Sequence, residues 1–382
     1  MSYLTRYPTT FKSTLGLQYP IIQGPFGGGA STVALTAAVS NSGGLGSYGA
    51  AYLSPNDISK TIGELRNAVT DGRPFSVNLW VPIEHDDVKN LAALKAGGKE
   101  VYEKHADRLK KYYKKVGRDA PPFPDQIGHN FEDQVQAALE ANPPVLSFIM
   151  GVPPPHVIAE AKRRNIYTMA TATTVAEALA LEAAGIDAIV ASGVEAAGHR
   201  GTFLPFNPAE TPNPDDTTFT LVPRIRAAVK KSIPVIAAGG VSTPEAIFAA
   251  LTLGADAVQI GTAFVVAQES GAAPIHKQSI LEKSDVARTT VLTRAFSGRQ
   301  ARGIPNAITK EFYSVENELP GYPVQNYLTL PFRKVAGRTD DKDLLVLWCG
   351  QSGTLVSNNG SAKDILQSLV DGVDSVVARM KL

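Results

Sequence analysis

One histidine in the chain stands out as a residue that could move a proton. His199 lies in the segment Gly193-Val-Glu-Ala-Ala-Gly-His-Arg-Gly201, directly after the apolar run 188–191. Histidine exchanges protons near neutral pH more readily than any other side chain. The flanking glycines let the backbone approach a ligand closely. A structural histidine in a tight turn is the alternative, and the neighbouring motifs favour a chemical role.

Two segments further along predict a phosphate site. The apolar run 233–238 leads into Gly239-Gly240 and then into a helix start, where Ser242 or Thr243 would be the cap. The next apolar run ends in Gly261-Thr262. Bare amides and a hydroxyl at neighbouring strand ends form a natural phosphate cradle. In eight-stranded α/β barrels this cradle often follows strands seven and eight.

The elements that must position these residues are strands that alternate with helices. This alternation predicts a parallel sheet, and the short repeat in the second half favours a closed TIM (β/α)8 barrel. An open, doubly wound α/β sheet is the alternative. The eight expected strands are 20–23, 44–47, 75–79, 145–149, 167–170, 188–191, 235–237 and 257–260.

The length of 382 residues exceeds the roughly 250 residues of a minimal barrel. We therefore expect residues 1–272 to form the barrel and residues 273–382 to form a smaller, mainly helical domain that covers it. A stretch near 84–120, rich in lysine and tyrosine, predicts a helical insertion after the third strand. Its charges indicate a solvated face.

Composition excludes several classes of partner. Lys and Arg number 37 against 36 Asp and Glu, so the net charge provides no general attraction for nucleic acid. No run predicts a membrane span or a signal peptide, which favours a cytoplasmic protein. The single cysteine, Cys349, excludes an internal disulfide, and we expect it to serve in packing. The other histidines lack metal-ligand spacing, so no metal site is predicted.

The segment Gly44-Leu-Gly-Ser-Tyr-Gly49 formally matches a dinucleotide-binding fingerprint. In a genuine fingerprint the helix begins within the glycine turn. Here the helix is expected to begin only at Pro55, so the motif does not predict a Rossmann fold.

Several motifs, in order and spacing, resemble the nitronate monooxygenases, formerly called 2-nitropropane dioxygenases. The resemblance spans nearly the whole chain. It rests on the segments 20–31, 41–46, 77–79, 195–201, 238–240, 259–262 and 296–303.

The resemblance implies an FMN-dependent enzyme that oxidises alkyl nitronates, such as propionate 3-nitronate, and nitroalkanes. It would use O₂ and yield a carbonyl compound and nitrite. His199 matches the catalytic histidine, as a base for neutral substrates or as a cation that holds the anion. Tyr322 and Tyr327 are the expected substrate tyrosines. The residues expected to bind FMN are Gln23, Gly24, Asn78, Ser192, Ala197, Gly198, Gly239, Gly240, Gln259, Ile260, Gly261 and Thr262.

The chain departs from the family pattern at three places. Ser192 replaces a common glutamine, Ala197 replaces a glycine, and Ile149 stands where relatives carry a second histidine. Three arginines (Arg200, Arg299 and Arg302) are candidates to steady an anion or to be structural partners. The sequence leaves a homodimer open.

Two other functions remain as alternatives. One is an FMN-dependent reductase of the same barrel group, which reduces quinones or enoyl thioesters with NAD(P)H. In that group proline usually follows the histidine, so Arg200 favours the monooxygenase. The other is a non-enzymatic flavin- or phosphate-binding protein, which the presence of His199 disfavours.

Overall fold

The computed structural model describes residues 1–83, 87–205, 215–282 and 289–380. Its central feature is a sheet of eight parallel strands in the order β1-β9-β8-β6-β5-β4-β3-β2. A bridge between Ile22 and Leu45 joins the first strand to the last, so the sheet closes into a barrel. The strands are β1 (Ile21–Gln23), β2 (Gly46–Gly49), β3 (Phe75–Trp80), β4 (Val145–Ile149), β5 (Tyr167–Ala172), β6 (Ala188–Ser192), β8 (Val235–Ala238) and β9 (Ala257–Ile260).

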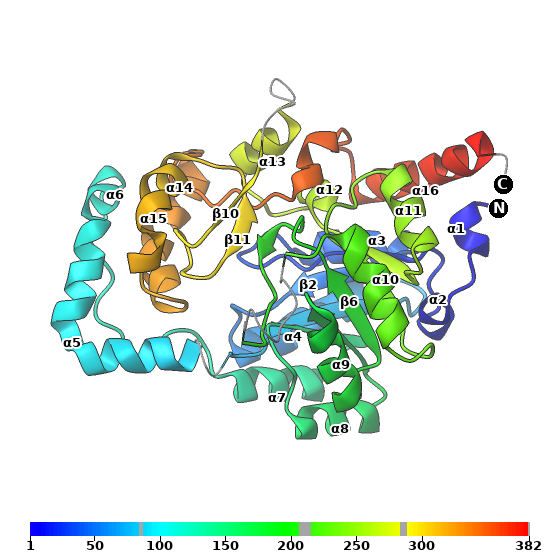
Figure 1. Cartoon of the computed structure of the whole chain (residues 1–382), viewed down its shortest axis with the longest axis horizontal. Coiled ribbons are helices and arrows are strands. Elements are labelled where there is room, and N and C mark those ends of the chain that lie inside the picture. The colour runs from blue at the N-terminus through cyan, green and yellow to red at the C-terminus, as the bar shows by residue number, and fades with distance from the viewer. Residues whose placement is uncertain (84–86, 206–214, 283–288, 381–382) are drawn as a thin grey trace.

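The TIM barrel prediction is confirmed, because each of the eight expected runs contains or overlaps one of these strands. Helices surround the sheet (Figure 1). Helix α4 begins at Pro55, as expected from the sequence. Ser54 caps α4 with Pro55 at its first turn, and Thr174 caps α9. Thr243, rather than Ser242, caps α11. The surrounding helices are α3 (Val33–Asn41), α4 (Pro55–Ala68), α7 (Phe131–Ala141), α8 (Pro155–Arg163), α9 (Val175–Ala184), α10 (Thr218–Ala228) and α11 (Pro244–Thr252).

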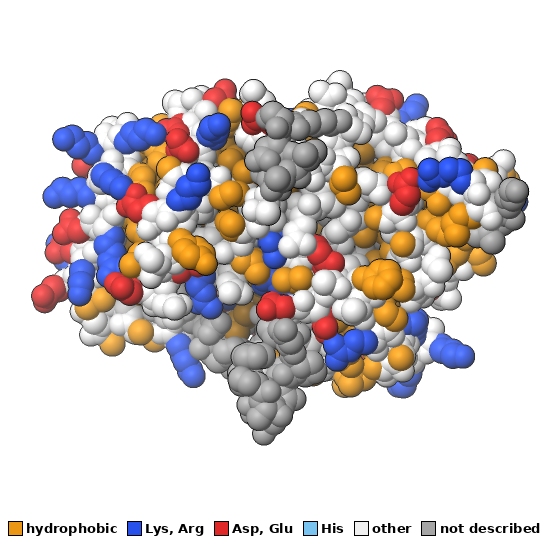
Figure 2. All heavy atoms as spheres, turned by 45° about the horizontal axis from the view of Figure 1, so that its top comes forward, with side chains coloured by type: hydrophobic (Ala, Val, Ile, Leu, Met, Phe, Trp, Pro, Cys, Tyr) orange, Lys and Arg blue, Asp and Glu red, His pale blue; other side chains and the backbone are white. Residues whose placement is uncertain are grey.

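The insertion after β3 forms two helices, α5 (Lys89–Arg108) and α6 (Lys110–Lys115). Helix α5 is sharply bent at Gly98, whose φ of 71° lies outside the helical region, and the bend is visible in Figure 1. The lysines of this insertion face solvent, as predicted, and Figure 2 shows Lys and Arg side chains interspersed with acidic ones over this end of the molecule.

The opposite face of the insertion is a hydrophobic contact surface. Tyr102, Tyr112 and Tyr113 are buried in a core that is separate from the barrel core. The same core contains Phe332 from α15 (Val324–Thr339) and Ile308 from α14 (Ala307–Phe312). The insertion and the segment after β9 therefore build the second core together.

The end of the chain returns to the barrel. Helix α16 (Ala362–Arg379) packs on α11, on α3 and on the N-terminal α1 (Tyr3–Arg6). Its residues Ile365, Leu369 and Val373 belong to the main barrel core. The second core thus draws on residues near 94–113 and 295–344, while the boundary at residue 273 stays a prediction.

A small second sheet links the two parts. It joins β10 (Val291–Thr293), β11 (Ala301–Gly303) and β7 (Gly198–His199) in antiparallel order. The last of these strands belongs to the glycine-rich loop after β6. Among the described helices, none has the length and apolar character that a membrane span requires.

Candidate active site

His199 lies where the barrel meets the second region. It follows β6, at the carboxyl ends of the barrel strands, and pairs with Ala301 of β11. Active sites of (β/α)8 barrels lie at this end because the loops after the strands converge there. The residues from Val194 to His199 keep part of their surface accessible, whereas the strand residues 188–191 beneath them are buried.

Aromatic side chains surround the imidazole of His199. The ring centroids of Trp80 and Trp348 lie 5.0 Å and 5.6 Å from it, both in edge-on geometry. Trp80 in turn contacts Tyr52, at 5.3 Å, and Tyr322, at 5.8 Å. The chain has only two tryptophans, and both touch this histidine.

Sequence reasoning missed these aromatic neighbours, apart from Tyr322. Trp80 follows the predicted Asn78 by two residues at the end of β3, so its position at a strand end could have indicated it. Tyr52 keeps 39% of its surface accessible although it contacts Trp80. An accessible tyrosine within such a cluster indicates space for a ligand beside the rings.

The hydrogen bonds of Ser297 favour one tautomer of His199, the one that carries its proton on Nε2. Ser297 Oγ lies 2.9 Å from His199 Nε2 and donates to the carbonyl of Arg299 at 3.1 Å. A hydroxyl has one proton to donate. With that proton committed to the carbonyl, Oγ accepts from Nε2–H. Nδ1 is then left with the lone pair that can accept a proton.

The imidazole is held in its neutral form. Burial, followed by the positive charges of Arg299 and Arg333, lowers the pKa of His199 to about 3. Desolvation and like charges both penalise the imidazolium. Of the two roles expected from the sequence, this environment favours the base over the cation.

Glycines form a cradle beside the histidine loop at the ends of β8 and β9. Gly239 and Gly240 have φ of 95° and 73°, in the region where only glycine is relaxed. A Cβ on Gly239 would lie 3.0 Å from the amide nitrogen of Ala196, so the loop lies directly on it. At the neighbouring strand end, Thr262 Oγ1 accepts a hydrogen bond from the amide of Gly350 at 3.0 Å.

These features fit the phosphate of FMN. A Cβ on Gly240 would have no atom nearer than 3.7 Å, so space adjoins this backbone. Gly239, Gly240, Gln259 and Gly261 all keep part of their surface accessible. Backbone groups at strand ends, bare of side chains, suit a phosphate.

The other predicted cofactor residues lie around the same end of the barrel. The amide of Gln23 is engaged by Ser47, donating to its carbonyl at 3.0 Å and accepting from its N–H at 3.1 Å. Gly24 donates to the carbonyl of Ile260 at 2.8 Å. Asn78 Nδ2 donates to Ser147 Oγ at 3.0 Å. Ser192, Ala197 and Gly198 belong to the histidine loop itself.

Two of the candidate arginines hold that loop in place. Arg200 Nη1 donates to the carbonyl of Gly193 at 2.7 Å, and Arg302 Nε donates to that of Val194 at 2.8 Å. Arg299 instead forms an ion pair with Asp87 and lies 5.0 Å from the ring centroid of Tyr322. All three arginines therefore interact with other groups of the protein itself.

Glu195 fixes the loop from the other side. Each of its carboxylate oxygens accepts from the amide of Thr218, the first residue of α10, at 3.0 Å. An anion at a helix N-terminus is favourable because of the helix dipole. This residue was quoted in the sequence motif without a role, and its contacts are structural.

The two predicted substrate tyrosines lie in different places. Tyr322 joins the aromatic cluster through Trp80, and burial raises the pKa of its phenol. Tyr327 donates its hydroxyl to the carbonyl of Pro122 at 3.1 Å, against the insertion. The structure brings Tyr322 alone to the surroundings of His199.

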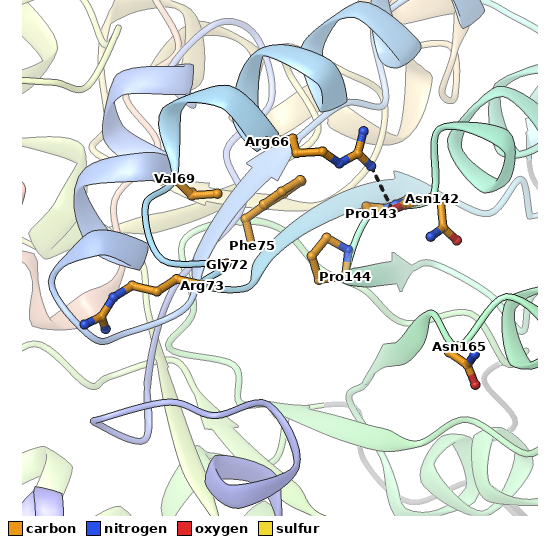
Figure 3. A pocket seen from close by; sticks show the side chains of 9 residues that line it. All are labelled: Arg66, Val69, Gly72, Arg73, Phe75, Asn142, Pro143, Pro144 and Asn165. Atoms are coloured by element: carbon orange, nitrogen blue, oxygen red, sulfur yellow. Dashed lines mark hydrogen bonds between the residues drawn. The ribbon is translucent and has the colours of Figure 1, made fainter.

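A separate cavity of about 310 Å³ lies at the opposite end of the barrel, at the start of β3 and β4. Figure 3 shows Arg66 directed toward the backbone near Asn142, to whose carbonyl it donates at 3.0 Å, while Arg73 points away. This end of a barrel generally serves stability rather than catalysis.

In the described part of the chain, no group of three or more His, Cys, Asp or Glu side chains could hold a metal ion. Cys349 is buried, as expected for packing.

The fold is that of a (β/α)8 barrel enzyme, and the candidate site lies at the carboxyl ends of its strands. The model of the nitronate monooxygenase family matches residues 9–372. The chain belongs to this family and is an oxidoreductase that oxidises nitronates or nitroalkanes.

Individual relatives agree with this assignment. A probable nitronate monooxygenase of Staphylococcus aureus strain Newman is 36% identical over 95% of this chain and 96% of its own. The structure resembles nitroalkane oxidase from Streptomyces ansochromogenes with a TM-score of 0.84 and 34% identity, covering 97% of this chain and 100% of the other. FabK from Thermotoga maritima follows at a TM-score of 0.73 and 28% identity, with 98% of each chain covered.

Proposed function

We propose that the protein is an FMN-dependent monooxygenase that oxidises alkyl nitronates, such as propionate 3-nitronate, and nitroalkanes. O₂ is the oxidant, and a carbonyl compound and nitrite are the products. The observation that carries the proposal is the neutral imidazole of His199, with Nε2 held by Ser297 and Nδ1 left as the acceptor. The nitroalkane oxidase and the curated relatives support the substrate class.

In this proposal Gly239, Gly240, Gly261 and Thr262 bind the phosphate of FMN, and Asn78 contacts the flavin. When bound, FMN supplies the redox chemistry that protein side chains lack. His199 Nδ1 takes the α-proton of a neutral nitroalkane, whereas a preformed nitronate needs no such transfer. Tyr322, as a member of the aromatic cluster, contacts the substrate. A substrate contact by Tyr327 stays a prediction.

The test compares two assays on the same flavin-loaded protein. Propyl-1-nitronate should drive O₂ uptake with nitrite release, whereas NADH or NADPH with a quinone should give no oxidation of the nicotinamide. Denaturation should release FMN, identified by chromatography. Rapid NAD(P)H oxidation without nitronate turnover would overturn the proposal, as would release of FAD.

The similarity to FabK supports a second candidate, a flavin-dependent NAD(P)H reductase of quinones or enoyl thioesters. Arg200 follows the histidine here and holds the loop through the Gly193 carbonyl. A proline at that position, usual in the reductases, has no such side chain. The same pair of assays separates the two functions.

A further inference from the structure

One cation near His199, Arg333, has no carboxylate partner among the residues that the structure describes. Arg333, on α15, donates from Nη1 to Asn326 Oδ1 at 2.8 Å and to Thr329 Oγ1 at 3.2 Å. Both acceptors are neutral. Its Nε is fully buried and has no hydrogen-bond partner. Within the described residues, the guanidinium therefore meets no carboxylate.

This isolation contrasts with the other arginines of the site. Arg299 is paired with Asp87, and Arg200 and Arg302 are committed to backbone carbonyls. A guanidinium stays charged at neutral pH even where burial lowers its pKa, as it does for Arg333. Arg333 is partly buried, and a charge withdrawn from water without a counter-ion is costly, so such a group is typical of a site that an anion completes.

Arg333 is connected to the catalytic histidine through a short chain of contacts. The hydroxyl of Thr329, which accepts from Arg333, donates to the carbonyl of Phe296. The next residue is Ser297, which holds His199 Nε2. Helix α15 thus lies along the segment that orients the imidazole, and it fixes Arg333 relative to His199.

The phenols of Tyr52 and Tyr322 in the aromatic cluster lie near Arg333. Tyr52 and Tyr322 are the groups that interact electrostatically with the Arg333 guanidinium. Both contact Trp80, whose ring also meets His199. The aromatic cluster therefore lies near both His199 and Arg333.

We propose that Arg333 binds a carboxylate at the far end of the substrate, so that the site selects nitronates that carry a second negative charge. This inference rests on the proposed function and adds the residue that recognises the second charge. The planar fork of a guanidinium matches a carboxylate with two parallel hydrogen bonds. The nitronate group of the substrate is the other anion that could bind the Arg333 guanidinium. Experiment can distinguish binding of the carboxylate from binding of the nitronate group.

The kinetic experiment compares two three-carbon substrates, propionate 3-nitronate and propyl-1-nitronate, which lacks the carboxylate. Arg333→Gln should raise KM for the first by about 10-fold to 100-fold, the loss of a charge-assisted hydrogen bond. It should leave KM for the second within about twofold, and Arg333→Lys should retain part of the selectivity. Lys334→Gln, an exposed neighbour on the same helix, is the matched control and should resemble the wild type. Equal losses on both substrates would assign the fork to the nitronate group and overturn the proposal, as would no loss on either.

A binding experiment reads the same site without turnover. The two tryptophans both lie beside His199, so their fluorescence should report binding of 3-nitropropionate or succinate to the flavin-loaded protein. Arg333→Gln should weaken this binding by a similar factor, and Lys334→Gln should not. If the wild type bound these acids through Arg333 yet oxidised no nitronate, the proposed function would fail while the carboxylate site stood. Unchanged affinity in a folded Arg333→Gln variant would remove the site.

Discussion

The hydroxyl of Ser297 lies 2.9 Å from Nε2 of His199, and its own proton goes to the carbonyl of Arg299. This contact favours the tautomer that carries its proton on Nε2. It also comes from a segment 98 residues away in the chain, so the imidazole is oriented by a part of the protein outside the barrel strands.

Replacing Ser297 with alanine should slow proton abstraction. Without the hydroxyl, Nε2–H loses its acceptor and the ring is free to change tautomer or rotate. We expect kcat for a neutral nitroalkane to fall by about 10-fold, part of the 10²–10⁴ that general base catalysis typically supplies. Steady-state rates on nitroethane and ethylnitronate are the measurement. Ser297→Thr, which keeps the hydroxyl, should recover much of the rate, and an alanine variant with full activity on nitroethane would refute the role of the contact.

His199→Asn should separate the two chemical roles of the histidine. As a base, His199 is needed only when the substrate still carries its α-proton, so turnover of a neutral nitroalkane should fall on the order of 10²–10⁴-fold. Turnover of the preformed nitronate should suffer much less. Circular dichroism and flavin content serve as the controls for folding. Comparable losses on both substrates would instead indicate that the imidazole binds the anion.

Gly240→Val should weaken FMN retention in a barrel that still folds. The backbone at Gly240 has φ of 73°, which costs a β-branched residue on the order of 1–2 kcal/mol. The added side chain would also project into space beside the cradle. The flavin-to-protein ratio after dialysis is the measurement. Gly63→Ala, in α4 with open space around it, is the control, and undiminished flavin in the valine variant would place the phosphate elsewhere.

The protein should lose stability in mild acid because buried histidines stay neutral. His276, 9% exposed, donates Nε2–H to the carbonyl of Trp348, and burial lowers its pKa to about 4. The unfolded chain takes up this proton near pH 6.5. The contribution to stability is therefore complete above pH 6.5 and is lost as the pH falls toward 4. The slope is about 1.4 kcal/mol per pH unit.

The matched variant is His276→Gln, which can still donate to the Trp348 carbonyl. Urea unfolding of both proteins at pH 7 and pH 5 is the measurement. The free energy of unfolding of the wild type should fall by about 2 kcal/mol more than that of the variant between these values. Parallel losses in the two proteins would show that His276 does not titrate in this range.

The barrel could be predicted from the sequence because its signals are local. Each strand is a short apolar run, and caps such as Ser54 and Thr174 mark the helices that follow. The glycines of the cradle could also be located from the sequence, since glycine is the residue type that adopts a positive φ, as at Gly239 and Gly240, without strain.

The rest of the site depends on contacts between distant segments, which leave no local pattern. The segment 296–303 is among the motifs that resemble the family, but no local pattern shows that Ser297 contacts His199 or that Arg333 lies near it, because the approach is made by β11 and α15. The burial of Tyr112 and Tyr113 likewise follows from packing against Phe332 of α15. In the sequence, the same stretch shows mainly its lysines.

The pairing of β7 with β11 has a consequence for the newly made chain. During synthesis the barrel strands through β9 are made before residues 301–303, so the loop with His199 at first lacks its strand partner. Such a nascent barrel can be compact and still be unable to oxidise nitro compounds. The chain becomes able to catalyse the reaction only when the later segment docks and places Ser297 beside His199. Catalysis therefore begins no earlier than the last steps of folding.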